Sequence, residues 1–80
     1  MDRQTVEARI LEILDDILCP DEPITRDTRM VDELGISSME SLSMLDRIEE
    51  MFGLSIPARE LRSVETFGDL GDMVMRYVEG

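Results

Sequence analysis

Residues 34–57 read LGISSMESLSMLDRIEEMFGLSIP, and this stretch carries the strongest structural signal in the chain. Apolar residues recur in it every three or four positions, which is the spacing of one face of an α-helix. They are Met39, Leu42, Leu45, Ile48 and Phe52. Gly53 follows where a helix end favours a left-handed backbone. The pattern predicts a helix over 38–52 with those five side chains turned inward.

The start of this helix carries a capping signal. Ser37 stands just before the first helical residue and Glu40 follows three positions later, so each side chain can bond the other residue's backbone N–H. Gly35 permits a tight turn ahead of the helix. Ser38 is then the first helical residue, and we expect its hydroxyl to lie exposed beside free N–H groups and partial positive charge. An anion attached to Ser38 would be favoured there.

Two further amphipathic helices flank this segment. The same spacing of apolar residues runs through 3–18 and 67–78. The expected inward residues of the first are Val6, Ile10, Ile13, Leu14 and Ile17. Those of the second are Phe67, Leu70, Val74, Tyr77 and Val78. Thr66 and Asp69 form a second capping box at the start of the last helix.

One long and one shorter connection join these helices. The long one spans 19–36, and Pro20 ends the helix before it because proline disfavours helix at the preceding residue. Four of its apolar residues are expected to lie over the core: Ile24, Met30, Val31 and Leu34. The shorter one contains Pro57, which suits the first turn of a brief helix running to Leu61. No strand pattern competes, so the sequence predicts one all-α domain over 1–80, with three main helices and one short helix.

The charge balance limits the partners. Eight basic against 19 acidic residues give a formal net charge of −11. Such a surface repels phosphate backbones and anionic membranes, so we expect neither nucleic acid nor membrane as a partner. Proteins with basic patches are the attractive partners. A surface that merely keeps a small protein soluble is the plainer alternative.

The absence of histidine limits the chemistry. Ser–His and Cys–His nucleophile pairs cannot be built from this chain, so we expect no enzyme. No segment shows the alternating ligands of a calcium loop, and we expect no metal site. Cys19 is the single cysteine, which excludes an internal disulfide and fits a reducing cytoplasm. We therefore expect a cytoplasmic monomer, and Met1 favours a free-standing protein over a piece of a larger synthase.

The decisive segment resembles the acyl carrier protein family, which includes polyketide and peptidyl carrier domains. The family motif Leu-Gly-x-Asp-Ser-Leu/Met corresponds here to Leu34-Gly35-Ile36-Ser37-Ser38-Met39. The stretch 48–57 looks like the family's Leu-Glu-Glu-Glu-Phe-Gly-Ile-x-Ile-Pro. The stretch 66–70 is similar to its Thr-Val-Gly-Asp-Leu. The likeness covers essentially the whole chain, in order and without large insertions.

The resemblance implies a four-helix acyl-carrier-like bundle and a carrier function. Ser38 would be esterified by 4′-phosphopantetheine from coenzyme A, and the thiol of that arm would hold an acyl, polyketide or peptidyl chain as a thioester. The protein would catalyse nothing and would serve fatty-acid, lipid or secondary-metabolite biosynthesis. Its partners would be a phosphopantetheinyl transferase and acyl-handling synthase enzymes.

The resemblance also implies that partners recognise the helix over 38–52 and its surroundings. The residues expected to meet them are Ser37, Met39, Glu40, Asp46, Glu49, Glu50 and Ile56. Two of these depart from the family. Asp46 stands where an apolar or small residue is usual. Ser37 replaces the family's Asp, so the cap is kept while the carboxylate that helps present the site is lost. An unmodified interaction module that docks through its acidic second helix therefore remains the alternative.

Plainer interpretations exist for individual residues. Ser37 and Ser38 could be helix caps alone. Glu40-Ser41-Leu42 imitates the motif one turn later, but Ser41 stands three residues too close to Phe52, so Ser38 is preferred. The seven methionines are expected to be adaptable core residues. The alternative, a cavity lined for an acyl chain, involves Met39, Met44, Met51 and Met73.

Overall fold

Four helices make up the secondary structure of the computed structural model, which describes residues 1–80. They are α1 (Arg3–Leu18), α2 (Ser38–Phe52), the 3₁₀-helix η1 (Ala58–Ser63) and α3 (Phe67–Glu79). The predicted all-α class with three main helices and one short helix is confirmed. No helix combines the length and the apolar character that crossing a lipid bilayer requires.

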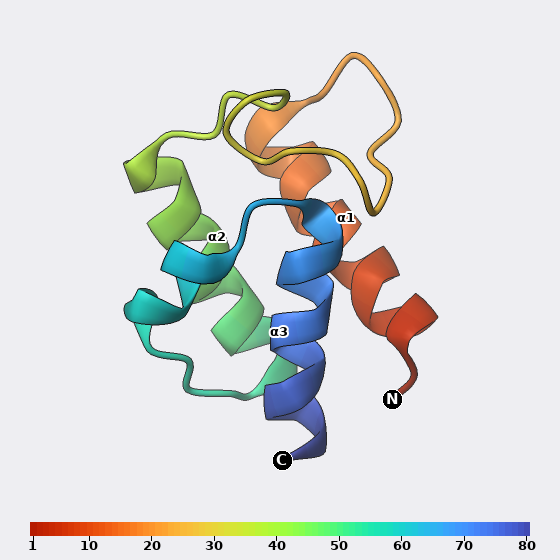
Figure 1. The fold of residues 1–80 in the computed structure, drawn as a ribbon. Helices are drawn as coiled ribbons and strands as arrows, with labels where there is room; N and C mark the ends of the chain where they lie inside the picture. The colour runs from red at the N-terminus through yellow and green to blue at the C-terminus, as the bar shows by residue number, and fades with distance from the viewer.

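The three long helices stand side by side, as Figure 1 shows. α1 contacts both α2 and α3, whereas η1 contacts α2 and α3. The long first connection crosses over one end of the bundle, and both chain termini lie at the other end (Figure 1). α2 begins at the end that the first connection crosses, opposite the termini (Figure 1).

One core of 14 buried apolar side chains fills the space between the helices. Its members are Val6, Ile10, Ile13, Leu14, Met30, Ile36, Met44, Leu45, Ile48, Ile56, Phe67, Leu70, Met73 and Val74. The inward faces predicted for α1 and α3 supply half of this set. Ile17, Tyr77 and Val78 are only partly buried, because they lie near the ends of their helices.

The inward face predicted for α2 was wrong in its first half. Met39 and Leu42 are 80% and 49% exposed, whereas Met44 joins Leu45 and Ile48 in the core. The reason is geometric. Met39 and Ile48 are nine residues apart, which is about two and a half helical turns, so the two side chains point to opposite sides of α2. The apolar residues of the first half of α2 are therefore available at the surface.

The first connection is fixed to the start of α3 by backbone hydrogen bonds. The Met30 N–H donates to the Glu65 carbonyl at 2.9 Å, and the Phe67 N–H donates to the Thr28 carbonyl at 2.8 Å. Met30 is buried as expected, but Val31 is 65% exposed, so the expectation that it lies over the core was wrong. These bonds hold a long segment without regular structure against the bundle.

Gly68 and Gly71 allow two parts of the chain to approach α3 closely. A Cβ atom at Gly68 would lie 2.9 Å from the Arg26 carbonyl oxygen, and one at Gly71 would lie 2.8 Å from Glu7 Oε2. Glycine weakens an isolated helix. These two glycines are explained by the close packing, because a larger residue would fit at neither position unless its neighbour moved. The Arg26 side chain also forms an ion pair with Glu7 across the same contact.

Substituting Gly68 tests this close approach. Alanine normally stabilises a helix relative to glycine, but we expect Gly68→Ala to lower the free energy of unfolding by about 1–3 kcal/mol, because the Arg26 backbone must move. Urea denaturation measures the change. Ala8→Gly, at an exposed position of α1, reports the propensity effect alone. A Gly68→Ala variant as stable as the wild type would contradict the packing argument.

Glu49 joins the last turn of α2 to the second connection. Its Oε2 accepts a hydrogen bond from the Ile56 N–H at 2.8 Å. The Ile56 side chain is 4% exposed and belongs to the core. The carboxylate therefore fixes the segment that leads into η1.

This role distinguishes Glu49 from its neighbour Glu50, which is exposed and makes no hydrogen bond or ion pair. We expect Glu49→Ala to cost about 1–3 kcal/mol, since a partly buried N–H loses its acceptor. Glu50→Ala should stay within about 0.5 kcal/mol of the wild type. Chemical denaturation of both variants measures the difference, and equal effects would show that the bond is not structural.

Candidate functional site

A reciprocal cap fixes the start of α2. The Glu40 N–H donates to Ser37 Oγ at 3.1 Å, and the Ser37 N–H donates to Glu40 Oε1 at 2.9 Å. Ser37 has an extended backbone, with φ −84° and ψ 168°, and Ser38 is the first helical residue. The predicted capping box is confirmed, and it places the Ser38 side chain at the N-terminus of α2.

The chain enters this cap through a sharp turn. Gly35 has φ +66°, a left-handed conformation that glycine adopts without strain. The Gly35 N–H donates to the Val31 carbonyl at 3.0 Å, which closes the turn. The side chain of Ile36 is buried in the core directly before the cap. The backbone is thus held on both sides of Ser38, while Ser38 itself faces solvent.

The Ser38 hydroxyl is free to react. It is exposed and takes part in no hydrogen bond in the structure. The backbone N–H groups of Ser38 and Met39 have no acceptor either, since the cap satisfies only Ser37 and Glu40. Free N–H groups at a helix start, together with the positive end of the helix dipole, favour a phosphate group. The residues present therefore fit a phosphodiester on Ser38.

The competing serine lies in a different environment. Ser41 is half-buried one turn inside α2, and its N–H donates to the Ser37 carbonyl at 2.9 Å. Ser38, not Ser41, stands at the open end of the helix. The geometry therefore favours Ser38, which the motif spacing in the sequence also favours.

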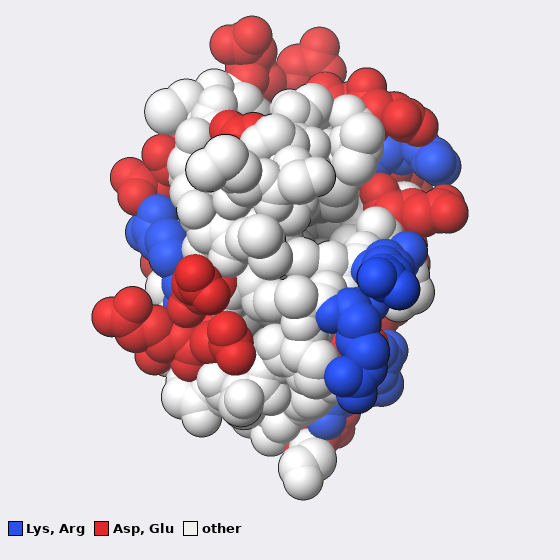
Figure 2. All heavy atoms as spheres, turned by 90° about the vertical axis from the view of Figure 1, so that its left-hand side faces the viewer, with Lys and Arg blue, Asp and Glu red and all other residues white.

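The surface over α2 and η1 is largely uncharged. Figure 2 looks at the side of the molecule where these helices lie and shows a broad area with few acidic or basic residues, bordered by acidic and basic groups. The exposed side chains of Met39 and Leu42 belong to this side of α2. Asp46 and Glu50 are exposed and follow Met39 at helical spacing, seven and eleven residues on.

Three residues expected at the partner surface are less accessible than the others. Ile56 is buried in the core, so its side chain cannot contact a partner in this conformation. Glu49 is half-buried and its carboxylate is held by the Ile56 N–H. Glu40 is half-buried in the cap. The exposed acidic residues among the predicted set are therefore Asp46 and Glu50.

The methionines divide between core and surface. Met44 and Met73 are buried in the core, whereas Met39 and Met51 are exposed. A hollow of about 460 Å³ is lined by residues of the first connection between Leu18 and Leu34, and no methionine lines it. A second hollow, beside Leu11 and Asp15, also has no methionine in its lining.

Three exposed residues of α2 and η1 were not predicted from the sequence to lie at the surface. Leu42 was assigned to the core, and Arg59 and Arg62 on η1 drew no comment. Their spacing of three was a usable signal, because residues three apart lie on the same side of a 3₁₀-helix.

Comparisons with known proteins agree with this geometry. The family model of the phosphopantetheine attachment site matches residues 8–74. The acyl carrier protein MbtL of Mycolicibacterium paratuberculosis is 41% identical over 66 residues, which cover 81% of this chain and 74% of the relative. An acyl carrier protein of Syntrophobacter fumaroxidans is 30% identical over 77 residues, or 95% of each chain.

A solved structure shows the same fold. It is assigned as an acyl carrier protein from Mycobacterium tuberculosis and superposes with a TM-score of 0.81 at 28% identity, covering 89% of this chain and 96% of the other. The family model spans most of the sequence, and both curated relatives match over most of their length. The chain therefore belongs to the acyl carrier protein family, whose members bear a covalent 4′-phosphopantetheine group and act as carriers, not as enzymes.

Proposed function

We propose that Ser38 carries the 4′-phosphopantetheine arm and that the protein delivers acyl, polyketide or peptidyl chains to enzymes of fatty-acid, lipid or secondary-metabolite biosynthesis. The observation that supports this most is the exposed Ser38 hydroxyl, which has no partner at the open end of α2. When bound, the arm supplies a terminal thiol that holds the chain as a thioester.

The residues around Ser38 suit the attachment step. Ser38 Oγ attacks the phosphorus of coenzyme A that bears the pantetheine; the new O–P bond forms as the P–O bond to the 3′,5′-adenosine bisphosphate breaks. The free N–H groups of Ser38 and Met39 lie where negative charge collects on the phosphate. No side chain of this protein bonds the hydroxyl, so the transferase must supply the base that takes its proton.

The exposed carboxylates of α2 suit an encounter with basic patches. Asp46 and Glu50 lie on the same exposed side as Met39, near the position that an enzyme must reach. Complementary charge speeds association and orients it. We propose that the carrier meets its transferase and synthase enzymes there, as a monomer in the cytoplasm.

Mass spectrometry tests the attachment residue. After incubation with coenzyme A and a broad-specificity phosphopantetheinyl transferase, we expect one added arm on the wild type and on Ser41→Ala, and none on Ser38→Ala. Loss of the exposed Ser38 hydroxyl should leave the fold intact, which circular dichroism checks. An unchanged wild-type mass with several transferases would favour the unmodified interaction module.

Restoring the family's carboxylate tests the departure at position 37. Asp and Ser cap helices about equally well, so Ser37→Asp should keep the stability within about 0.5 kcal/mol. We expect it to speed attachment several-fold, measured as the initial rate of arm transfer. Ser37→Ala should instead lose about 1 kcal/mol of stability with no gain in rate. A Ser37→Asp variant no faster than the wild type would show that this carboxylate does not limit modification.

Charge reversal tests the acidic side of α2. We expect the pair Asp46→Lys and Glu50→Lys to lower kcat/KM of the transferase about tenfold at low salt, and less at high salt where charges are screened. The pair Asp21→Lys and Glu22→Lys makes the same charge change in the first connection, where both residues are exposed. Equal effects of the two pairs would argue for net charge instead of a specific surface.

A further inference from the structure

Basic side chains are scarce in this protein, and most of them are paired. Five arginines form ion pairs with carboxylates: Arg3, Arg26, Arg29, Arg47 and Arg76. Three form none: Arg9 on α1, and Arg59 and Arg62 on η1. With 19 acidic residues in the chain, two unpaired arginines on one short helix are unexpected.

The 3₁₀ geometry of η1 brings these two arginines together. A 3₁₀-helix has three residues per turn, so residues three apart lie on the same side. Arg59 and Arg62 are both exposed and have this spacing. They therefore form one cationic site on the surface of η1.

The nearest acidic residue in the sequence does not neutralise this site. The carboxylate of Glu60 accepts a hydrogen bond from the Tyr77 hydroxyl and pairs with Arg76 at 3.4 Å. The hydrogen bond to Glu60 raises the pKa of Tyr77. Glu60 is thus occupied by α3, and the charges of Arg59 and Arg62 remain available to another molecule.

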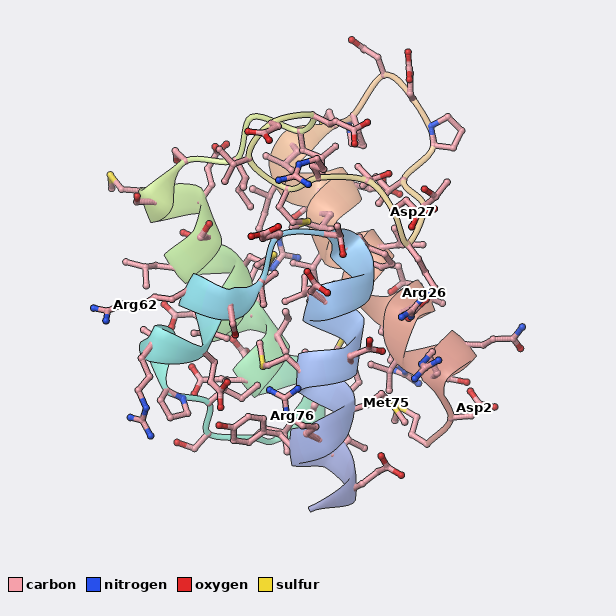
Figure 3. All side chains as sticks on the ribbon, viewed as in Figure 1. Asp2, Arg26, Asp27, Arg62, Met75 and Arg76 are labelled. Atoms are coloured by element: carbon pink, nitrogen blue, oxygen red, sulfur yellow. The ribbon has the colours of Figure 1, made fainter.

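The cationic site borders the face that contains Ser38. η1 packs against α2, and Figure 3 shows Arg62 pointing away from the bundle on that side, opposite the side that holds Arg26. Figure 2 shows basic groups along the lower right edge of this area, whereas the left edge holds mostly acidic groups. Met39 and Leu42 are the exposed apolar residues of α2 on this face.

An interface of ordinary size is large enough for one partner to contact both edges of the uncharged area. A standard protein interface buries about 800 Å² on each side, and the whole chain exposes 5027 Å². A footprint of that size over Ser38, Met39 and Leu42 is large enough to include η1, which contacts α2.

We propose that α2 and η1 form one docking face with opposite charges on its two edges. The phosphopantetheinyl transferase places carboxylates opposite Arg59 and Arg62, apolar side chains over Met39 and Leu42, and basic groups opposite Asp46 and Glu50. This inference rests on the proposed function, because it concerns the enzyme that modifies Ser38. The two edges together fix the direction in which the partner lies across α2.

Binding to a phosphopantetheinyl transferase tests this face without requiring the reaction. The carrier is used as Ser38→Ala, and its dissociation constant and association rate are measured at low salt. In this background we expect Arg59→Glu and Arg62→Glu each to weaken binding about fivefold to tenfold, with a smaller loss at high salt. The matched control is Arg3→Glu, an equal charge change beside Asp72, on the side of the molecule that holds Arg26. It should bind as the parent does.

Each other outcome overturns the proposal. Unchanged or tighter binding of Arg59→Glu and Arg62→Glu would show that no carboxylates face η1. Failure of the parent to bind would exclude this face for the enzyme that must reach Ser38. A dimer in sedimentation that Arg62→Glu abolishes would assign the face to a second copy. Failure of the proposed function is separate: the transferase binds, but the protein with Ser38 present gains no mass.

Discussion

The structure depends on how the chain enters α2. The side chain of Ile36 must be buried and the helix must begin two residues later, which forces the backbone through the left-handed turn at Gly35. Ser37 and Glu40 then satisfy each other's N–H groups, so the first turn cannot unwind without losing both bonds. Ser38 is exposed as a consequence of this constraint, between an anchored residue before it and a capped helix after it.

The remaining parts of the fold keep that entry in place. A domain of this size buries only about 60% of the surface of its unfolded chain, so a long first connection would be easily displaced. It is held by backbone bonds to the residues around Thr66 and by the close approach of Arg26 to Gly68. α3 thus supports the segment that leads into α2.

Local signals made the helices and the Ser38 cap predictable from the sequence, whereas exposure at the site was only partly predictable. Caps and helix ends involve neighbours within four residues, so Ser37 and Gly53 could be interpreted directly. Which side of α2 faces the core depends on where α1 and α3 pack. Met39 was therefore assigned to the interior as well as to the partner surface, and only the second assignment agrees with its exposure. The hydrogen bond between Glu49 and Ile56 was not predicted, because it spans seven residues and a turn.

A carrier without catalytic groups must be recognised through its surface, and surface charge alone does not specify a docking pose. The excess of acidic groups attracts basic partners from many directions. An apolar area limits where close contact can occur, but Met39 and Leu42 leave the partner free to rotate over them. Charges of opposite sign on two edges of that area remove this freedom, because a reversed partner would meet like charge on both edges. The unpaired arginines of η1 therefore add information about orientation that the acidic residues of α2 cannot provide.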